Sequence, residues 1–225
     1  MQLTYLGHSA VELELSKSSV LIDPFITNNP VAKANADDFT PSHIILTHAH
    51  GDHVGDTEDI AKRCGAVVIS SFEIVNYFAS KDIEGHGMNP GGSFQFSFGK
   101  VKFTPAWHSS SFPDGTYGGM PMGVIIEAEG KRIYHAGDTA LFSDMQLIGK
   151  KALDIALLPI GDNFTMGPED AVEAVKLLRP KTVIPIHYNT FGQIEQDAHA
   201  FKQAVEAETS SQCVVLSAND SYKME

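Results

Sequence analysis

One short stretch of the chain, residues 47–53 (THAHGDH), concentrates side chains that bind metal ions. It holds three histidines and an aspartate, and it directly follows an apolar run at residues 44–46. Neutral imidazole and carboxylate groups are ligands for zinc, and also for iron or manganese. A solvated polar turn would tolerate the same composition, so residues elsewhere in the chain decide between the two interpretations.

Other candidate ligands follow other predicted strands, at the point where each strand ends. His108, Asp138 and His187 each come shortly after a run of strand-forming residues. If these strand ends share one edge of the fold, the side chains converge on one cleft, as functional loops on a rigid scaffold do. The sequence therefore favours a metal site over a polar turn.

The number and spacing of these residues predict two adjacent ions. Residues two apart in an extended turn project the same way, so the first two histidines of the cluster can share one ion. A carboxylate has two oxygens and can serve two cations at once. The predicted ligands are His48, His50 and His108 for one ion, and Asp52, His53 and His187 for the other, with Asp138 bridging both.

Four further residues belong to the predicted site as supports of the ligands or as substrate contacts. His8 and Asp23 end predicted strands and would hydrogen-bond ligands, since metal-bound imidazoles generally give their other N–H to an acceptor. The alternative is that His8 is a turn residue and Asp23 a loop cap. His135 and Tyr188 are next to strand-end ligands or close to them, and alternation along an extended strand turns them to the other side. A structural role is therefore favoured for both over contact with the substrate.

Short strands joined by tight turns, followed by alternating strands and helices, make up the expected scaffold. Each half of the chain begins with hairpins and finishes with strand–helix units, which predicts two sheets packed face to face with helices outside. Two glycine-rich segments, 85–92 and 109–123, are predicted loops, and the second would form a rim over the cleft with Phe112 and Tyr117 exposed. The predicted strands are 3–6, 10–15, 19–22, 44–46, 67–70, 93–98, 101–106, 124–127, 132–135, 155–159, 182–185 and 214–216; the predicted helices are 57–63, 72–79, one that opens at Pro168, and 194–207.

Composition and charge limit the partners and the compartment. The formal net charge is −12 over 225 residues, which repels phosphate backbones and anionic membranes and favours a small-molecule substrate. The sequence is also compatible with a homo-oligomer. The first residues show no signal peptide, and the two cysteines, Cys64 and Cys213, are expected to be buried free thiols in a reducing cytoplasm. No linker divides the chain, so residues 1–225 are expected to form one domain.

The motif HxHxDH, formed by His48, His50, Asp52 and His53, resembles that of the metallo-β-lactamase superfamily, and the resemblance covers essentially the whole chain. It implies an α+β fold, a four-layer αββα sandwich with the metal site at one edge between the two sheets, and a dinuclear site in which Asp138 is the bridging residue. Segments 5–10 (YLGHSA), 21–25 (LIDPF), 134–139 (YHAGDT), 161–171 (GDNFTMGPEDA) and 185–191 (PIHYNTF) resemble a branch of metal-dependent hydrolases related to L-ascorbate-6-phosphate lactonase.

The ligand set and the resemblance together predict a metal-dependent hydrolase. Two divalent ions, zinc first and manganese or iron as alternatives, would lower the pKa of bound water toward about 7. The resulting metal-bridging hydroxide would attack a small ester, lactone or amide, and Asp52 would steer it and pass a proton to the leaving group. A phosphodiesterase or nuclease could use the same site, because two ions also suit displacement at phosphorus. The remaining alternative is an inactive metal- or partner-binding module.

Overall fold

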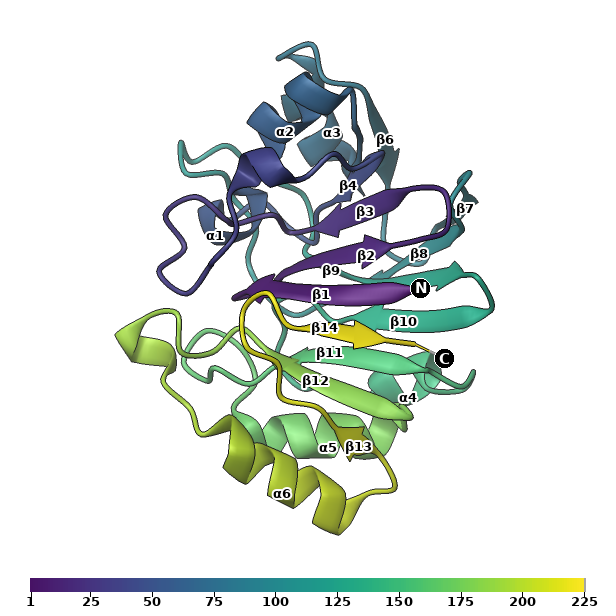
Figure 1. Cartoon of the computed structure of the whole chain (residues 1–225), viewed down its shortest axis with the longest axis vertical. Coiled ribbons are helices and arrows are strands. Elements are labelled where there is room, and N and C mark those ends of the chain that lie inside the picture. Colours follow the sequence, from purple (N-terminus) through teal and green to yellow (C-terminus); the bar gives the residue numbers. More distant parts are fainter. Residues whose placement is uncertain (225) are drawn as a thin grey trace.

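Two mixed β-sheets lie face to face in the computed structural model, which describes residues 1–224 (Figure 1). Residue 225, the last of the expected domain, lies outside the described residues. The first sheet has the order β14 (Ser221–Lys223), β1 (Gln2–Gly7), β2 (Ala10–Glu14), β3 (Ser19–Ile22), β4 (His43–Ile45), β5 (Val67–Ser71) and β6 (Gly85–Met88). The second has the order β13 (Gln212–Cys213), β12 (Thr182–Ile186), β11 (Ile155–Pro159), β10 (Lys131–His135), β9 (Met122–Ala128), β8 (Lys100–Pro105) and β7 (Ser93–Gln95).

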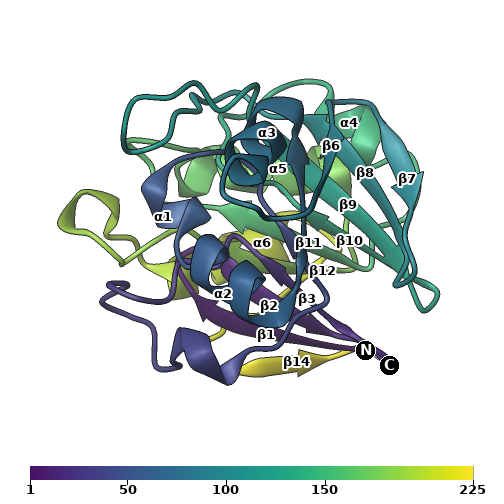
Figure 2. The ribbon, with the colours of Figure 1, turned by 90° about the horizontal axis from the view of Figure 1, so that it is seen from above.

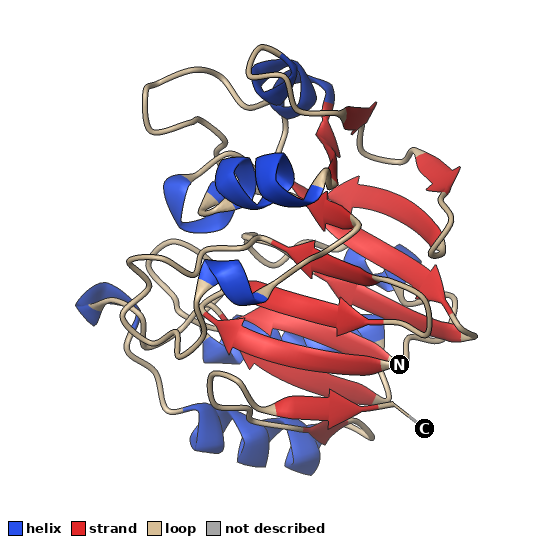
Figure 3. Ribbon diagram, turned by 45° about the horizontal axis from the view of Figure 1, so that its top comes forward, coloured by secondary structure: helices blue, strands red, loops and turns tan. Residues whose placement is uncertain are grey.

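Helices cover the outer face of each sheet, so the layers run helix, sheet, sheet, helix (Figure 3). The first sheet is covered by α2 (Thr57–Cys64) and α3 (Phe72–Ala79), whose Ile60, Ile74 and Phe78 are buried against its strands. The second is covered by α4 (Met145–Ile148), α5 (Pro168–Leu178) and α6 (Ala198–Glu208). The expected α+β sandwich is therefore confirmed.

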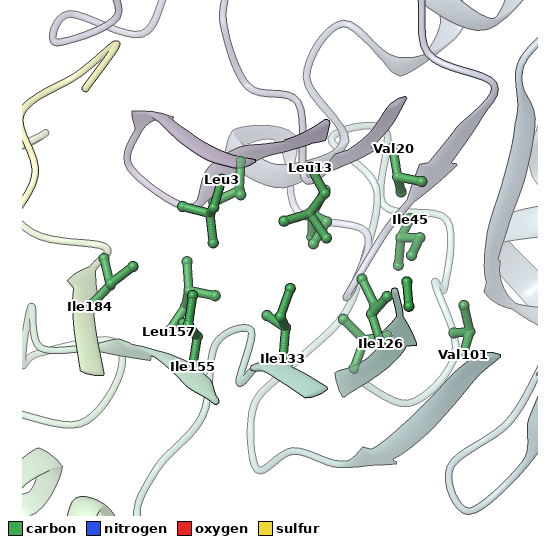
Figure 4. Packing of buried hydrophobic residues seen from close by; sticks show 14 of the residues in the cluster. Leu3, Leu13, Val20, Ile45, Val101, Ile126, Ile133, Ile155, Leu157 and Ile184 are labelled. Carbon is green, nitrogen blue, oxygen red and sulfur yellow. The ribbon is translucent and has the colours of Figure 1, made fainter. Parts of the chain in front are cut away.

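The main core fills the space between the sheets. In β8, Val101 and Phe103 are buried while Lys100 and Lys102 are exposed, as the period of two along a strand requires. Facing side chains of the two sheets meet in Figure 4: Leu3, Leu13, Val20 and Ile45 from the first, and Ile126, Ile133, Leu157 and Ile184 from the second.

Strand direction explains why the candidate ligands lie at one edge of the sandwich. In the first sheet β3, β4 and β5 are parallel, and β1 runs the same way because both β1 and β3 pair antiparallel with β2. In the second sheet β10, β11 and β12 are parallel, and β8 shares their direction through β9. The loops after β1 and β3 lie together with the short helix α1 (Gly51–Val54) on the left of Figure 1 and away from the N-terminus (Figure 2).

The helix and the strand predicted nearest the C-terminus are displaced, the strand predicted over 93–98 ends at Gln95, and one predicted loop is a strand. The helix expected over 194–207 begins at Ala198, because the Asp197 side chain caps it by accepting from the backbone N–H of His199 and Ala200. Residues 192–194 form a separate 3-10 turn. The strand expected at 214–216 is wrong, since β13 ends at Cys213.

The glycine-rich segment 85–92 holds strand β6, paired in parallel with β5. A Cβ on Gly85 would lie 2.7 Å from Val75 Cγ1, so glycine lets α3 pack closely on this strand. That close packing is why a segment with loop-like composition forms an edge strand. The short strand β14 was not predicted either.

One of the two aromatic residues predicted to be exposed in the segment 109–123 is buried. Phe112, expected to be exposed, is 3% exposed and stacks on the ring of Tyr77 in α3 with 3.7 Å between ring centroids. Tyr117 is exposed as predicted. Both cysteines are free, but Cys64 is only half-buried. Within residues 1–224, no helix has the length and apolar character needed to cross a membrane.

Candidate metal centre

All the predicted ligands gather at the edge where these parallel strands end. Their ligand atoms form overlapping groups in which every pair of atoms is within 4.8 Å. The groups are His48, His50 and His108; His48, His53 and Asp138; and Asp52, His53 and His187 together with His8. They come from the loops after β1, β4, β8, β10 and β12, so both sheets contribute.

Asp138 lies at the centre of the cluster and is 3% exposed. Its Oδ2 atom is 3.0 Å from His187 Nε2 and 3.5 Å from His108 Nε2, and its Oδ1 atom is 3.3 Å from His53 Nε2. The preceding Gly137 has a φ of +62°, and a Cβ there would lie 2.8 Å from the Met122 carbonyl oxygen. Glycine therefore allows the chain to turn and bring Asp138 between the histidines.

Asp23 fixes the orientation of the ligand loop from behind. This buried carboxylate accepts hydrogen bonds from Thr47 N at 2.8 Å, from Thr47 Oγ1 at 2.6 Å and from His53 Nδ1 at 2.8 Å. Because His53 donates its Nδ1 proton to Asp23, its Nε2 atom, which faces Asp138, is the nitrogen left to bind a cation. The Thr47 hydroxyl, having donated to Asp23, can accept from His48 Nδ1 at 3.1 Å, which leaves His48 Nε2 free to bind a cation.

His8 lies within the cluster itself, in the same group as Asp52 and His187. Its Nε2 atom is 3.2 Å from Asp52 Oδ2, its Nδ1 atom is 2.9 Å from Thr190 Oγ1, and its ring centroid is 4.1 Å from that of His187. His8 and His187 both have positive φ, at 58° and 54°, and His187 N donates to His8 O at 2.7 Å. Left-handed backbone at non-glycine residues costs free energy and often marks functional sites.

Buried atoms without hydrogen-bond partners show that the residues fit divalent cations. Within the described chain, His53 Nε2 and Asp138 Oδ1 are buried and accept no hydrogen bond. Leaving such a group unpaired costs about 1–3 kcal/mol. His48 Nε2 and His50 Nδ1 face each other at 3.0 Å, and a cation would satisfy both lone pairs. A donor set of imidazoles and carboxylates suits zinc, manganese or iron.

The charges in the cluster lead to the same conclusion. Burial works against a charged His53, but the carboxylates of Asp138 and Asp23 outweigh it and raise the pKa of His53 well above its usual value. Burial likewise opposes ionisation of Asp138, yet His187 and His53 hold its pKa well below the usual range. Burial lowers the pKa of His48 and keeps it neutral. A divalent cation would replace the proton on His53 as the partner of Asp138.

Two of the predicted neighbours lie outside the cluster. His135 is fully buried; its Nε2 donates to Ser9 O at 3.0 Å, and its Nδ1 accepts from Gly137 N at 3.1 Å. It therefore supports the turn that carries Asp138. Tyr188 packs against the core beneath the helices of the second sheet, and burial raises its pKa to about 12.

The sequence analysis missed three hydroxyl side chains that contact the histidines. Thr47 and Thr190 contact His48 and His8 as described above, and Ser109 Oγ is 3.3 Å from His50 Nε2. Thr47 and Ser109 each adjoin a predicted ligand in sequence, which was an available signal. Nothing in the sequence around Thr190 pointed to His8, because the two are far apart along the chain.

Comparison with known proteins agrees with this geometry. Residues 18–188, which include every predicted ligand, match the family described as the beta-lactamase superfamily domain. Fold and site thus define a member of the metallo-β-lactamase superfamily, and the expected superfamily is confirmed. Two relatives are UPF0173 metal-dependent hydrolases: one from Thermus thermophilus is 59% identical over 203 residues and 90% of each chain, and one from Pelotomaculum thermopropionicum is 52% identical over 229 residues and 100% of each.

The chain therefore belongs to the UPF0173 metal-dependent hydrolases. A solved structure has the same fold: Igni18, a metallo hydrolase from Ignicoccus hospitalis, superposes with a TM-score of 0.91 at 41% identity, over 100% of this chain and 99% of its own. The narrower relation to L-ascorbate-6-phosphate lactonase remains a prediction.

Proposed function

We propose that this metal-dependent hydrolase binds two divalent metal ions and hydrolyses a small ester, lactone or amide. The position of Asp138 carries the proposal, because its carboxylate lies between the two ligand sets: it is 3.5 Å from His108 Nε2 on one side and 3.0 Å and 3.3 Å from His187 Nε2 and His53 Nε2 on the other, and a carboxylate can serve two cations. Zinc is the first choice and manganese or iron the alternatives. The proposed ligands are His48, His50 and His108 for one ion and Asp52, His53 and His187 for the other, with Asp138 shared.

Two such cations would ionise water near neutral pH and take up charge from the substrate oxygen. The protein supplies position and proton transfer. Asp23 and Thr47 hold the rings of His53 and His48 in the tautomers that leave Nε2 free. Asp138 contacts histidines of both proposed ligand sets and so holds the two sets next to each other.

Asp52 is the proposed proton carrier. Its side chain is 31% exposed, so it reaches the open side of the cluster. Burial opposes its ionisation, but the hydrogen bond from His8 and the nearby histidine charges hold its pKa below the usual range. An ionised Asp52 can accept a proton from the attacking water and return it to the leaving group.

The sequence motifs add support for a lactone among the candidate substrates, because they resemble the branch related to L-ascorbate-6-phosphate lactonase. Two free cysteines are consistent with the reducing cytoplasm proposed for the chain. A small-molecule substrate fits a site assembled from short loops on a rigid scaffold.

The test combines metal analysis with a substrate panel. Protein loaded with zinc, manganese or iron should hold two equivalents by elemental analysis and should turn over lactones or carboxylic esters. Bis-p-nitrophenyl phosphate serves as the comparison substrate. Turnover of the phosphodiester alone would assign the site to phosphodiester hydrolysis, and a metal-loaded protein that hydrolyses none of the panel would indicate a binding module. A single metal equivalent would contradict the dinuclear assignment.

A further inference from the structure

We infer that the site takes an uncharged substrate whose apolar group lies against a ring of exposed apolar side chains around the metal cluster. The inference rests on the proposed function and specifies its substrate class. The ring consists of five residues, called the rim residues below: Trp107, Tyr117, Met120, Phe164 and Phe191.

The rim residues stand out because large apolar side chains are seldom exposed together without a binding role. Of the eight such side chains that are exposed within residues 1–224, five are the rim residues. Trp107 is 68% exposed and Phe164 is 54% exposed. All five lie in loops that follow strands at the edge where the predicted ligands gather.

Two rim residues are placed beside Asp138 by hydrogen bonds of the main chain. Trp107 N donates to Thr139 Oγ1 at 3.0 Å, and Thr139 directly follows Asp138. Met166 N donates to Thr139 O at 3.0 Å, which fixes the turn that carries Phe164 against the same residue. Trp107 also directly precedes His108. Two separate loops that carry exposed aromatic residues therefore lie next to Asp138.

Another rim residue lies on the side of His8. The ring of Phe191 has its centroid 5.5 Å from that of His8 and is 37% exposed. Its loop carries His187 at the opposite end.

The last two rim residues belong to the segment that covers the turn at residues 48–50. Gly118 N, next to Tyr117, donates to Ser110 O at 3.1 Å, and the hydroxyl of Ser110 accepts from Ala49 N at 3.2 Å. Met122 N donates to Thr47 O at 3.0 Å, which fixes the chain just after Met120. The loops that carry the rim residues thus lie on the sides of β4, β10 and β12.

The loops that carry the predicted ligands and the rim residues have few basic side chains, and this indicates the charge of the substrate. The segments 8–9, 23–42, 46–56, 106–121, 136–144, 160–167 and 187–197, all within the described residues, contain no arginine and a single lysine, Lys33. Lys33 lines a different pocket, shared with Pro30, Leu216 and Ala218 and with none of the predicted ligands. A phosphate or carboxylate on the substrate would therefore find no lysine or arginine of these segments beside the predicted ligands.

Acidic residues strengthen this selection against anions. Asp144, Asp162 and Glu195 lie in the same loops as the rim residues or in the loop after Asp138. Together with the overall charge of −12, they repel an anionic substrate before it reaches the metal ions. An uncharged ester or lactone with an apolar chain meets no such barrier, and its chain can cover the exposed rings.

Trp107 offers a direct binding assay, because it is the single tryptophan of the chain. Its fluorescence is followed while the lactam analogue of γ-decalactone, which carries a hexyl chain, is added to the metal-loaded protein. The unsubstituted γ-butyrolactam and a lactam whose chain ends in a phosphate serve as comparisons. We expect a saturable blue shift with a Kd about tenfold or more tighter for the hexyl lactam than for either comparison.

Phe164→Ala should weaken this binding about tenfold. Phe94→Ala is the matched control, because Phe94 is 47% exposed but lies in β7, paired with the start of β8 and far along the strand from His108. Equal affinities for the hexyl lactam and γ-butyrolactam, tighter binding of the phosphate-bearing lactam, or equal effects of the two substitutions would each overturn the inference.

Kinetics separate this inference from the proposed function. Trp107→Ala and Phe164→Ala should raise KM for γ-decalactone about tenfold while changing KM for γ-butyrolactone and both kcat values less than about twofold. If fluorescence shows the dependence on chain length but the wild type hydrolyses no ester, lactone or amide, the proposed function fails and the rim assignment stands. If lactones are hydrolysed with no dependence on chain length or on the rim residues, the rim assignment fails alone.

Discussion

Substituting Asp23 by asparagine tests whether this buried carboxylate prepares the site for metal. The carboxylate accepts three hydrogen bonds, two from Thr47 and one from His53 Nδ1. An asparagine oxygen can keep the bond from Thr47 N, but its amide group would then face the Thr47 hydroxyl and His53 Nδ1 with N–H donors. His53 would have to move its proton to Nε2, the nitrogen that the metal needs.

The size of the effect follows from this change of tautomer. Loss of a hydrogen-bonding partner behind a metal-bound histidine typically costs 10- to 100-fold in metal affinity, or about 1.4–2.7 kcal/mol. Asp23→Asn should therefore bind zinc about 10- to 100-fold more weakly. Folding of the metal-free protein should also lose about 1–3 kcal/mol, because a buried donor is left unpaired.

The assay is competition for zinc with a chromophoric chelator, accompanied by urea denaturation of the metal-free protein. Asp56→Asn is the matched control: Asp56 also accepts two backbone hydrogen bonds, from Ile26 N and Thr27 N, but contacts no predicted ligand. It should change stability and leave zinc affinity unchanged. If Asp23→Asn bound two equivalents with wild-type affinity, the orienting role of Asp23 would be refuted.

Three further substitutions give distinct outcomes. His50→Ala should lower both metal content and activity, whereas His86→Ala, far from the cluster, should change neither; unchanged stoichiometry in the first would count against the ligand assignment. Gly137→Ala should lower metal content and cost about 1–3 kcal/mol of folding free energy by denaturation, because a Cβ there would lie 2.8 Å from Met122 O at a φ of +62°. Gly130→Ala has a similar φ of +74° but nothing near its Cβ, so an equal loss of metal in both would show that the clash is unimportant. Burial lowers the pKa of His8 to about 4, so between pH 6.5 and 4 the unfolded chain binds a proton that the folded chain does not, and folding weakens as the pH falls. His8→Gln should remove about 2 kcal/mol of the stability that the metal-free wild type loses between pH 7 and pH 5, and identical losses in both proteins would contradict the buried neutral His8.

The ligand positions could be predicted from the sequence because each follows a strand whose pattern is clear. Apolar runs end at residues 46 and 186, just before His48 and His187, and the strand that ends at His135 lies three residues before Asp138, so these positions were easy to locate. Parallel strands in each sheet then place these ends together. The helix at Pro168 was equally visible, with proline in its first turn and two acidic residues after it.

The errors arose where tertiary packing overrides local composition. Phe112 lies among glycine, serine and proline, and only the stacking of its ring on Tyr77 buries it. Gly85 looks like a loop residue, but it forms a strand because α3 packs against it. His8 and Thr190 meet through the pairing of distant loops, which no local pattern reveals.

The division of the metal cluster between the two sheets has a consequence for how the protein matures. His48, His50 and His53 leave the ribosome early, with the first sheet, whereas Asp138 and His187 emerge only with the last parallel strands of the second. A cation captured by the nascent chain can meet only the early histidines and would bind loosely. The full set of candidate ligands can therefore come together only after synthesis has passed β12.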